Sequence, residues 1–348
     1  MAEAAQQIPE DIHMETDDET HPQKRDAESS AILEGSGISC DVVCTRVEST
    51  PDTSLVEYID IAPDSEEVDL SHSRIDKIED MQMLTKVKSL CFRQNLIKKI
   101  ENLHFLASTL VELDLYDNQL EKVENLDALV NLEHLDLSFN RIRVIENLDH
   151  LTNLKRLYFV HNKITQIANL DALHKLEILE LGDNRLRKIE NLDSLTNLTE
   201  LYLGKNKITV IEGLTKLTKL RILSIQSNRL TVIQGLETLV ELRELYLSSN
   251  GISNIDGLGG NLKLNILDLA CNRIANLKNL DHLLDLQELW FNDNLLSDFR
   301  KLDDLQPCLK LNTVYFERNP IYSDPNYRRK VKLAFPHLDQ IDATLCHA

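Results

Sequence analysis

Long apolar runs and paired cysteines are both missing from this sequence of 348 residues. No stretch of about 18 apolar residues occurs, and the N-terminal residues lack the basic start and apolar run of a signal peptide. The six cysteines stand at positions 40, 44, 91, 271, 308 and 346, without matched spacing or a C-x-x-C pair. We therefore expect reduced thiols in a nuclear or cytoplasmic protein whose sequon Asn197-Leu198-Thr199 is not glycosylated.

Catalytic motifs are absent as well. The sequence contains no G-x-S-x-G, G-x-x-x-x-G-K-[ST], H-E-x-x-H or G-x-G-x-x-G pattern. The eleven histidines are scattered; His13 and His21 stand among acidic residues and could bind a metal weakly, but simple solvation of the segment is the favoured explanation. The sequence predicts a protein that is not an enzyme and that holds no cofactor and no metal.

Acidic residues outnumber basic ones, and unevenly along the chain. The net charge is −19, and residues 1–67 contribute −15 of it, from 18 Asp and Glu against 3 Lys and Arg. The remaining residues carry 39 acids against 35 bases, a net charge of −4. An acidic chain without a basic stripe is a poor match for nucleic acid or for an anionic membrane, so neither is expected as a partner.

The first part of the chain is an acidic leader at residues 1–52, poor in aromatic residues. Such a composition cannot bury enough apolar surface to offset the entropy of ordering, so the leader is predicted to be disordered. Acidic or proline neighbours make Thr16, Thr50 and Ser65 candidate phosphorylation sites, with a merely solvated segment as the alternative.

A repeat with a period of 22 residues dominates the remainder. Residues 135–156 read LDLSFNRIRVIENLDHLTNLKR, and the next units read LYFVHNKITQIANLDALHKLEI, LELGDNRLRKIENLDSLTNLTE and LYLGKNKITVIEGLTKLTKLRI. Twelve units align on Ser73, Asn95, Asn118, Asn140, Asn162, Asn184, Asn206, Asn228, Asn250, Asn272, Asn294 and Asn319. The spacing departs from 22 only in the 23-residue gap after Asn95 and the 25-residue gap before Asn319.

Each part of the pattern L-x-L-x-x-N-x-[IL] has a structural role. In a strand the two leucines point to one side and the residue between them to the other. The asparagine amide can bond backbone groups where the chain leaves the strand, so stacked units would form an asparagine ladder. The apolar residues that follow at three-residue spacing suit a tight, partly 3-10 return. The pattern is typical of a leucine-rich repeat, whose units bury a shared core only by stacking.

These features predict an α/β leucine-rich-repeat solenoid of about twelve 22-residue units. A curved parallel sheet should line the concave face, with short 3-10 or helical returns on the convex face. We expect the leader at 1–52, an N-terminal cap at 53–67, repeats at 68–319 and a helical C-terminal cap at 320–348. The apolar run at 55–61 should cover the open edge of the first repeat.

The C-terminal end departs from the regular repeat. The three extra residues before Asn319 should make the return bulge at 304–308, where Pro307 interrupts it. A short closing helix is expected next. Its apolar face should consist of Tyr327, Val331, Leu333, Phe335 and Leu338, and its solvated basic residues should be Arg328, Arg329, Lys330 and Lys332.

The outward residue of each predicted strand should contribute to one row along the concave sheet. In order the row reads Asp69, Cys91, Asp114, Asp136, Tyr158, Glu180, Tyr202, Ser224, Tyr246, Asp268, Trp290 and Tyr315. Five of its members are aromatic, although the whole chain has only 8 Phe, 8 Tyr and 1 Trp, and five are acidic. A solvated sheet face needs no exposed aromatic residues, whereas an interface uses them as anchors, so we interpret the row, with Glu288 beside it, as a protein-binding surface.

The repeat I-x-x-I-E-N-L-x-x-L, the acidic leader and the C-terminal Y-R-R-K-V…F-P-x-L-x-x-I-D-A resemble the leucine-rich-repeat regulatory subunits of protein phosphatase 1 over about residues 55–348. The resemblance implies a non-enzymatic nuclear and cytoplasmic protein, monomeric on its own, that binds the phosphatase catalytic subunit through its concave face. It also implies roles in phosphatase activity, maturation or targeting and in mitosis. The contact residues it implies are Asp136, Tyr158, Glu180, Tyr202, Asp268, Glu288, Trp290 and Tyr315, to which the row adds Tyr246.

Two points stay open at the level of sequence. Many partners of this phosphatase dock through an R/K-V-x-F segment, and the nearest string here, KVKL at residues 330–333, lacks the aromatic residue. The usual docking groove would then stay free for a third regulatory protein. The alternative function is a cytoskeletal or ribonucleoprotein adaptor built on the same repeat.

Overall fold

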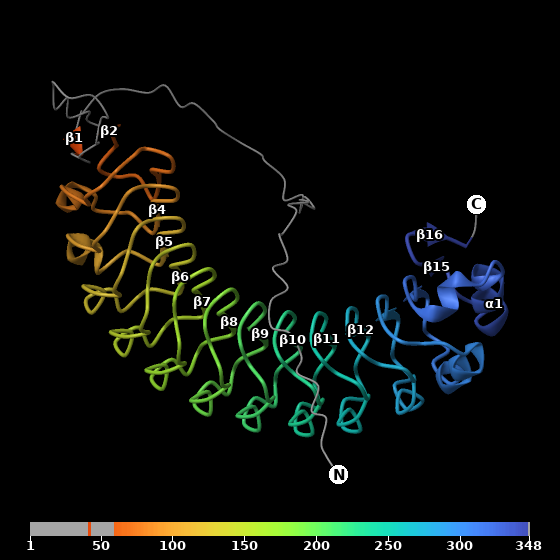
Figure 1. Ribbon diagram of the computed structural model, residues 1–348. Coiled ribbons are helices and arrows are strands. Elements are labelled where there is room, and N and C mark those ends of the chain that lie inside the picture. The colour runs from red at the N-terminus through yellow and green to blue at the C-terminus, as the bar shows by residue number, and fades with distance from the viewer. Residues whose placement is uncertain (1–40, 43–58, 347–348) are drawn as a thin grey trace, which may run out of the picture. The chain divides into compact units, whose positions relative to one another are not determined.

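The computed structural model describes residues 41–42 and 59–346. These residues form a small antiparallel sheet of β1 (Asp41–Val42) and β2 (Ile59–Asp60) and a separate 14-stranded sheet (Figure 1). No helix in this part of the chain is both long and apolar enough to cross a bilayer.

The large sheet receives one three-residue strand from each repeat, β3 to β14, and two two-residue strands from the C-terminal end. Its strands are β3 (Glu67–Asp69), β4 (Ser89–Cys91), β5 (Glu112–Asp114), β6 (His134–Asp136), β7 (Arg156–Tyr158), β8 (Ile178–Glu180), β9 (Glu200–Tyr202), β10 (Ile222–Ser224), β11 (Glu244–Tyr246), β12 (Ile266–Asp268), β13 (Glu288–Trp290), β14 (Thr313–Tyr315), β15 (Gln340–Ile341) and β16 (Thr344–Leu345). They lie in chain order, all parallel except the terminal pair β15–β16. The predicted solenoid with a parallel sheet is confirmed.

The returns between strands are turns in most repeats, with short helices near the two ends of the array. These helices are η1 (Met81–Met83), η2 (Leu103–Leu106), η3 (Phe299–Leu305), η4 (Pro320–Ser323) and the α-helix α1 (Tyr327–Ala334). The three extra residues were predicted to form a bulge at 304–308. They are instead accommodated by η3, which begins at Phe299, before the predicted bulge, and ends at Leu305, before Pro307. Because η3 absorbs the insertion, Trp290 still pairs in register with Tyr315 on the next strand.

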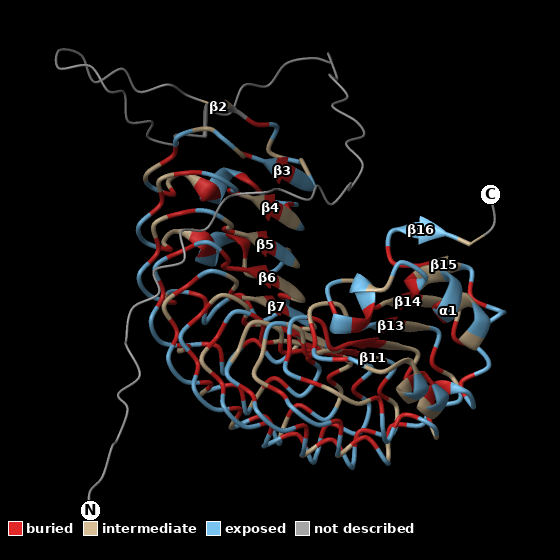
Figure 2. Ribbon diagram, turned by 45° about the vertical axis from the view of Figure 1, so that its right-hand side comes forward, coloured by how far each residue is buried: buried red, intermediate tan, exposed pale blue. Residues whose placement is uncertain are grey.

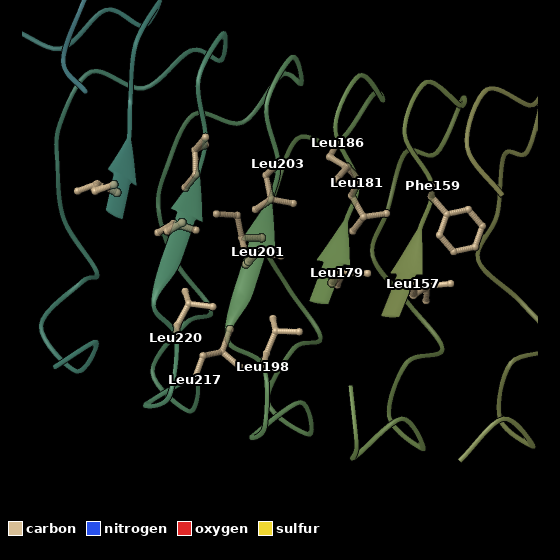
Figure 3. Packing of buried hydrophobic residues seen from close by; sticks show 14 of the residues in the cluster. Leu157, Phe159, Leu179, Leu181, Leu186, Leu198, Leu201, Leu203, Leu217 and Leu220 are labelled. Atoms are coloured by element: carbon tan, nitrogen blue, oxygen red, sulfur yellow. The ribbon is translucent and has the colours of Figure 1, made fainter. Parts of the chain in front are cut away.

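The core lies between the sheet and the returns, and each repeat contributes the same positions to it. Figure 3 shows Leu157, Leu179 and Leu201 side by side on neighbouring strands, and all three are fully buried. Buried residues recur in this way through the whole array (Figure 2). Each buried leucine contributes about 1.5–3 kcal/mol of transfer free energy, so the stack is stabilised evenly along its length.

The predicted asparagine ladder is present from Asn95 to Asn319. At a typical rung the Asn140 amide donates to the carbonyls of Leu115 (3.0 Å) and Leu137 (3.1 Å). Its oxygen accepts from the Leu120 N–H at 2.9 Å. One buried side chain thus satisfies backbone groups of two successive repeats, which fixes both the turn and the spacing between repeats.

A second asparagine ladder runs along the returns and was not predicted. It consists of Asn102, Asn125, Asn147, Asn169, Asn191 and Asn279, each of which donates to a carbonyl of the preceding repeat. All six have positive φ, between 58° and 65°. The equivalent residues of three repeats are Gly213, Gly235 and Gly257, with φ of 70°. The occurrence of either Asn or Gly at the third place of the motif [IVL]-x-[NG]-L is the sequence signal of this left-handed position.

Gly235→Ala should therefore lower the free energy of unfolding by about 1–2 kcal/mol, because alanine disfavours positive φ. An added Cβ would also lie 2.5 Å from the Ile211 carbonyl oxygen. Gly235→Asn should cost less, since asparagine occupies the same position in six other repeats. Urea denaturation measures all three chains. Gly259→Ala is the matched control, because no atom lies within 4 Å of its added Cβ, and an equal loss there would contradict the assignment.

At the N-terminal end, Ile61 is buried in the core and Ile59 packs against it. The Thr85 and Lys88 N–H groups of the first repeat donate to the Pro63 and Glu66 carbonyls at 3.0 and 2.7 Å. Residues 59–67 thus pack on the first repeat. The rest of the predicted cap, at 53–58, and the leader apart from the β1 backbone lie outside the described residues, as do Thr16 and Thr50. Ser65 is half-buried in a turn, where its N–H donates to the Ala62 carbonyl.

At the C-terminal end a helix is present, but two predictions about it are wrong. Leu333 is 69% exposed, because it lies two residues and therefore about 200° from the buried Val331. Arg328 is not solvated: its guanidinium donates to the carbonyls of Ile341, Thr344 and Leu345. Lys332 likewise donates to the Leu338 carbonyl. Both basic side chains tie the helix to the last strands instead of facing water.

The strands β15 and β16 were not predicted, and Asp342 between them holds this end together. Its carboxylate accepts from the N–H groups of Phe316 (2.8 Å) and Glu317 (3.0 Å) and from the Tyr327 hydroxyl at 2.9 Å. Burial and this carboxylate raise the pKa of Tyr327, so the hydroxyl stays a donor. The cap thereby closes the exposed edge of β14.

Candidate protein-binding face

Strand register places the twelve outward residues predicted from the sequence in one continuous row. Asp69 pairs with Cys91, Asp136 with Tyr158, and Trp290 with Tyr315, and the intervening strands follow the same register. We call these twelve residues the central row. The residues two positions earlier point to the same side of the sheet and form a second row. Its members are Glu67, Ser89, Glu112, His134, Arg156, Ile178, Glu200, Ile222, Glu244, Ile266, Glu288 and Thr313.

The two rows are joined in the middle of the sheet by tyrosine–glutamate pairs. The Tyr202 hydroxyl donates to Glu200 Oε2 and the Tyr246 hydroxyl donates to Glu244 Oε2, both at 2.8 Å. Burial, reinforced by these carboxylates, raises the pKa of both tyrosines, so each phenol remains a neutral donor. The pairs hold both the rings and the carboxylates in fixed positions before any partner arrives.

Towards the C-terminal repeats, three aromatic side chains of the central row form a cluster. The ring centroids of Tyr246 and Trp290 are 6.4 Å apart and those of Trp290 and Tyr315 are 5.9 Å apart, both in edge-to-face geometry. Gln340 donates to the Tyr315 hydroxyl at 2.7 Å and fixes its ring. Trp290 is 36% exposed, so this cluster presents a rigid apolar anchor to solvent.

The N-terminal part of the face has a different character, because Arg93 sits among its acids. The guanidinium lies 2.6 Å from Asp114 and 3.5 Å from Asp136, and 4.7 Å from the centre of the Tyr116 ring. Asp136 is buried and also accepts from the Ser138 N–H at 2.9 Å. Sequence reasoning missed Arg93, which lies two residues after the central row, a position that also faces this side of the sheet.

Of the other predicted contact residues, Tyr158 and Glu180 lie between these two regions, and Glu288 lies on the same strand as Trp290 of the aromatic cluster. Tyr158 is half-buried beside His134, with ring centroids 5.2 Å apart, and burial raises the pKa of its hydroxyl. Glu180 lies in register between Tyr158 and Tyr202 and is half-buried. Glu288, also half-buried, lies one strand away from Thr313 and Ile266 in the second row.

Asp268 is the most enclosed acid of the row, between Tyr246 and Trp290 on the neighbouring strands. It is 5% exposed and accepts from the Ala270 N–H at 3.0 Å. Burial raises the pKa of its carboxyl above 3.8. A raised pKa in the folded chain means that ionising this group costs stability, and the cost appears as the pH rises through 3.8 towards neutrality.

Asp268→Asn should consequently raise the melting temperature at neutral pH, because the amide oxygen can still accept from Ala270 while the buried charge is gone. The difference from the native chain should shrink to nothing below about pH 3.5, where the native carboxyl is protonated in both states. Scanning calorimetry from about pH 3 to pH 7 checks this. Asp193→Asn, an exposed acid on a return, controls for net charge. A variant less stable than the native chain at neutral pH would show that the carboxylate's bonds outweigh its desolvation.

No group of three or more His, Cys, Asp or Glu within the described ranges is placed to hold a metal ion. His13 and His21 lie outside those ranges. Cys91, Cys271, Cys308 and Cys346 are free thiols. The described concave face presents packed rings, oriented carboxylates and a row of side chains held in register.

Comparison with curated proteins gives short, strong matches. A 60-residue segment is 57% identical to protein phosphatase 1 regulatory subunit 7 of Xenopus tropicalis and covers 17% of each chain. A 50-residue segment is 60% identical to the human protein of that name and covers 14% of each. A 75-residue segment is 48% identical to protein phosphatase 1 regulatory subunit SDS22 of Schizosaccharomyces pombe, covering 21% of this chain and 22% of the relative. The matched segments thus span about a fifth or less of these relatives.

Solved structures agree with the fold. An internalin (inlF) of Listeria monocytogenes aligns with a TM-score of 0.64 at 24% identity, over 80% of this chain and 87% of the other. A leucine-rich-repeat protein of Leptospira interrogans aligns with a TM-score of 0.60 at 23% identity, over 75% and 73%. At this level of identity the two structures support the architecture alone.

The model of the family described as leucine-rich repeats matches residues 108–152, 152–194, 196–238, 219–260 and 240–282. Together these segments cover half of the chain, and they coincide with the repeats whose strands and asparagine ladder have been described. The chain accordingly belongs to the leucine-rich-repeat family.

Proposed function

We propose that this chain is a non-catalytic regulatory subunit that binds the catalytic subunit of protein phosphatase 1 through its concave face. The observation that carries the proposal is the central row, in which five aromatic and five acidic side chains follow one another in register. The segments shared with proteins named as regulatory subunits of this phosphatase point to the same partner.

Binding would rest on preorganisation. The Tyr202 and Tyr246 hydroxyls already hold their glutamates, and the Trp290 cluster is already packed, so few side chains lose freedom when a partner docks. An interface of standard size, roughly 1,600 Å² in total, needs only part of the row. The aromatic cluster supplies the apolar anchor, and the carboxylates pair with basic residues of the partner and set its register.

Regulation would follow from how the solenoid covers the enzyme. A rigid scaffold on one side of the phosphatase can block substrate or metal entry, hold an immature form, or direct it to a location in the nucleus or cytoplasm. Because this chain carries no R/K-V-x-F segment, the enzyme's usual docking groove stays open to a third protein. Localisation, phosphorylation and a mitotic role remain predictions.

Calorimetry of the full chain against the phosphatase catalytic subunit tests the proposal. Tight one-to-one binding is expected, and a saturating R/K-V-x-F peptide should leave it unchanged, because the two sites differ. Competition by that peptide would contradict docking through the folded face. Absence of binding by a correctly folded chain would overturn the phosphatase assignment and favour the cytoskeletal or ribonucleoprotein adaptor.

A further inference from the structure

A basic stripe runs along one edge of the solenoid, although the sequence was interpreted as having none. The residue after each ladder asparagine is Arg141, Lys163, Arg185, Lys207 and Arg229 in five consecutive repeats. We call these five residues the basic ladder. Their 22-residue spacing hides them in the linear sequence, where acidic residues of other positions intervene.

The backbone fixes the spacing of the basic ladder. The N–H groups of Arg141, Lys163 and Arg185 each donate at 2.8 Å to a carbonyl of the preceding repeat, and Lys207 and Arg229 continue the pattern at 2.8 and 2.9 Å. Each rung stands between a ladder asparagine and an isoleucine or leucine that point into the core, so its own side chain points outward. With neighbouring strands about 4.8 Å apart, five rungs span roughly 19 Å.

The side chains of the basic ladder have no partners among the described residues. None of the five forms a side-chain hydrogen bond or ion pair there; Arg141, Arg185 and Arg229 are exposed, and Lys163 and Lys207 are half-buried. The lysines of another row behave differently, since Lys175 and Lys219 donate to Asn153 and Asn197 at 2.7 Å and Lys263 pairs with Glu241 at 2.5 Å. The two rows therefore differ: the second shares its donors with neighbouring side chains, whereas those of the basic ladder are free to bind a ligand.

Neighbouring charges leave the basic ladder uncompensated. The residues two positions before its rungs are Phe139, His161, Asp183, Lys205 and Ser227. Asp183, the one acid among them, lies 2.7 Å from His161 Nδ1. At its N-terminal end the ladder borders a shallow hollow of about 530 Å³, lined by Lys98, Lys99, Lys122 and Arg141 together with Glu121 and Glu124.

We propose that the basic ladder is a docking surface for an extended acidic peptide segment of a partner protein. Unpaired positive charges in an evenly spaced row, fixed by the backbone, complement a strand-like peptide, which rises about 3.3 Å per residue and would cover the ladder with about six residues. Nucleic acid fits less well, because a long polyanion would run past the five rungs onto the adjoining repeats, where the equivalent residues are the uncharged Gln119 and Gly251. The surface is separate from the central row and does not depend on the phosphatase assignment.

Fluorescence anisotropy of the full chain with a labelled deca-glutamate peptide tests this proposal. We expect binding at about 50 mM salt that weakens markedly at about 300 mM, as screening shortens the Debye length. The variant with Lys163→Gln, Arg185→Gln and Lys207→Gln should lose affinity about tenfold or more. A second variant with Lys175→Gln, Lys219→Gln and Lys263→Gln removes the same charge from the paired row and should bind within about twofold of the native chain.

Three outcomes would overturn the proposal. The first is that the native chain fails to bind the peptide at low salt. The second is that the two triple variants lose affinity equally, which would show that the peptide responds to the overall charge of the protein and not to the basic ladder. The third is that a deca-thymidine oligonucleotide binds more tightly than the peptide. Thermal melting checks that both variants fold. Retention of phosphatase binding by the basic-ladder variant would show that the two surfaces act independently.

Discussion

Trp290→Ala is expected to weaken binding to the phosphatase catalytic subunit by about 2–4 kcal/mol, or roughly 30-fold to 1,000-fold in affinity. Trp290 is the exposed centre of the aromatic cluster, held edge-to-face by Tyr246 on one side and Tyr315 on the other. Its removal takes away the largest apolar surface of the central row. It also leaves its two neighbours without a packing partner, so the cost includes lost preorganisation.

Two features make this experiment decisive. Trp290 is the sole tryptophan of the chain. The intrinsic tryptophan fluorescence of the chain therefore reports the environment of Trp290, and we expect this emission to change when the phosphatase binds, after subtraction of the phosphatase's own emission. Phe105→Ala is the matched control, because Phe105 is 48% exposed in η2 on the returns. It should change affinity by less than about twofold. Tight native binding that survives Trp290→Ala would keep the partner and move the interface away from the concave face.

The central row could be predicted from the sequence because two periodicities combine there. The 22-residue repeat fixes which residues are equivalent, and strand alternation fixes which of them face outward. Asp136 and Tyr158 are 22 residues apart and Trp290 and Tyr315 are 25 apart, yet both pairs lie in register. Counting positions back from the ladder asparagine was therefore enough, since the insertion falls in a return and leaves the strands untouched.

Contacts between side chains could not be predicted in the same way. Arg93 reaches across two strands to Asp114 and Asp136. Which acids an arginine contacts depends on its side-chain rotamer and on whether the neighbouring side chains are small enough to leave room for it. The tyrosine–glutamate pairs could have been predicted from the sequence, because in a strand the motif E-L-Y places the Glu and Tyr side chains on the same face, two residues apart. The row also proved less accessible than expected, with Asp136 and Asp268 buried beneath their neighbours.

The ends of the array escaped prediction because they leave the period. Leu333 was placed on the buried face from hydrophobicity alone, although helix geometry turns it outward from Val331. Arg328 and Asp342 satisfy backbone groups that the next repeat would have satisfied if the stack continued. A pattern based on the repeat cannot predict such residues, because they bond to backbone groups that are left unpaired only where the repeats end.

The buried asparagine ladder carries the largest stability prediction. Asn206 donates to the carbonyls of Leu181 (2.9 Å), Leu203 (3.0 Å) and Gly204 (3.2 Å) and accepts from the Leu186 N–H at 2.9 Å. Asn206→Ala leaves several buried backbone groups of two repeats without partners, and each unsatisfied group costs about 1–3 kcal/mol. We expect the variant to lose about 3–5 kcal/mol in urea denaturation, since water can reach only part of the gap.

The position of Asn206 in mid-array adds a second signature. Each repeat of a solenoid is stabilised by contacts with its nearest neighbours. A weakened central repeat should therefore let the two halves of the array unfold separately, which would lower the dependence of the unfolding free energy on urea concentration. Asn153→Ala is the matched control, because the Asn153 amide makes a single backbone bond, to the Val130 carbonyl at 2.9 Å, at a partly exposed site. It should cost less than about 1 kcal/mol and leave the dependence on urea concentration unchanged. Equal losses in the two variants would mean that the ladder is dispensable and that the leucine core alone holds neighbouring repeats in register.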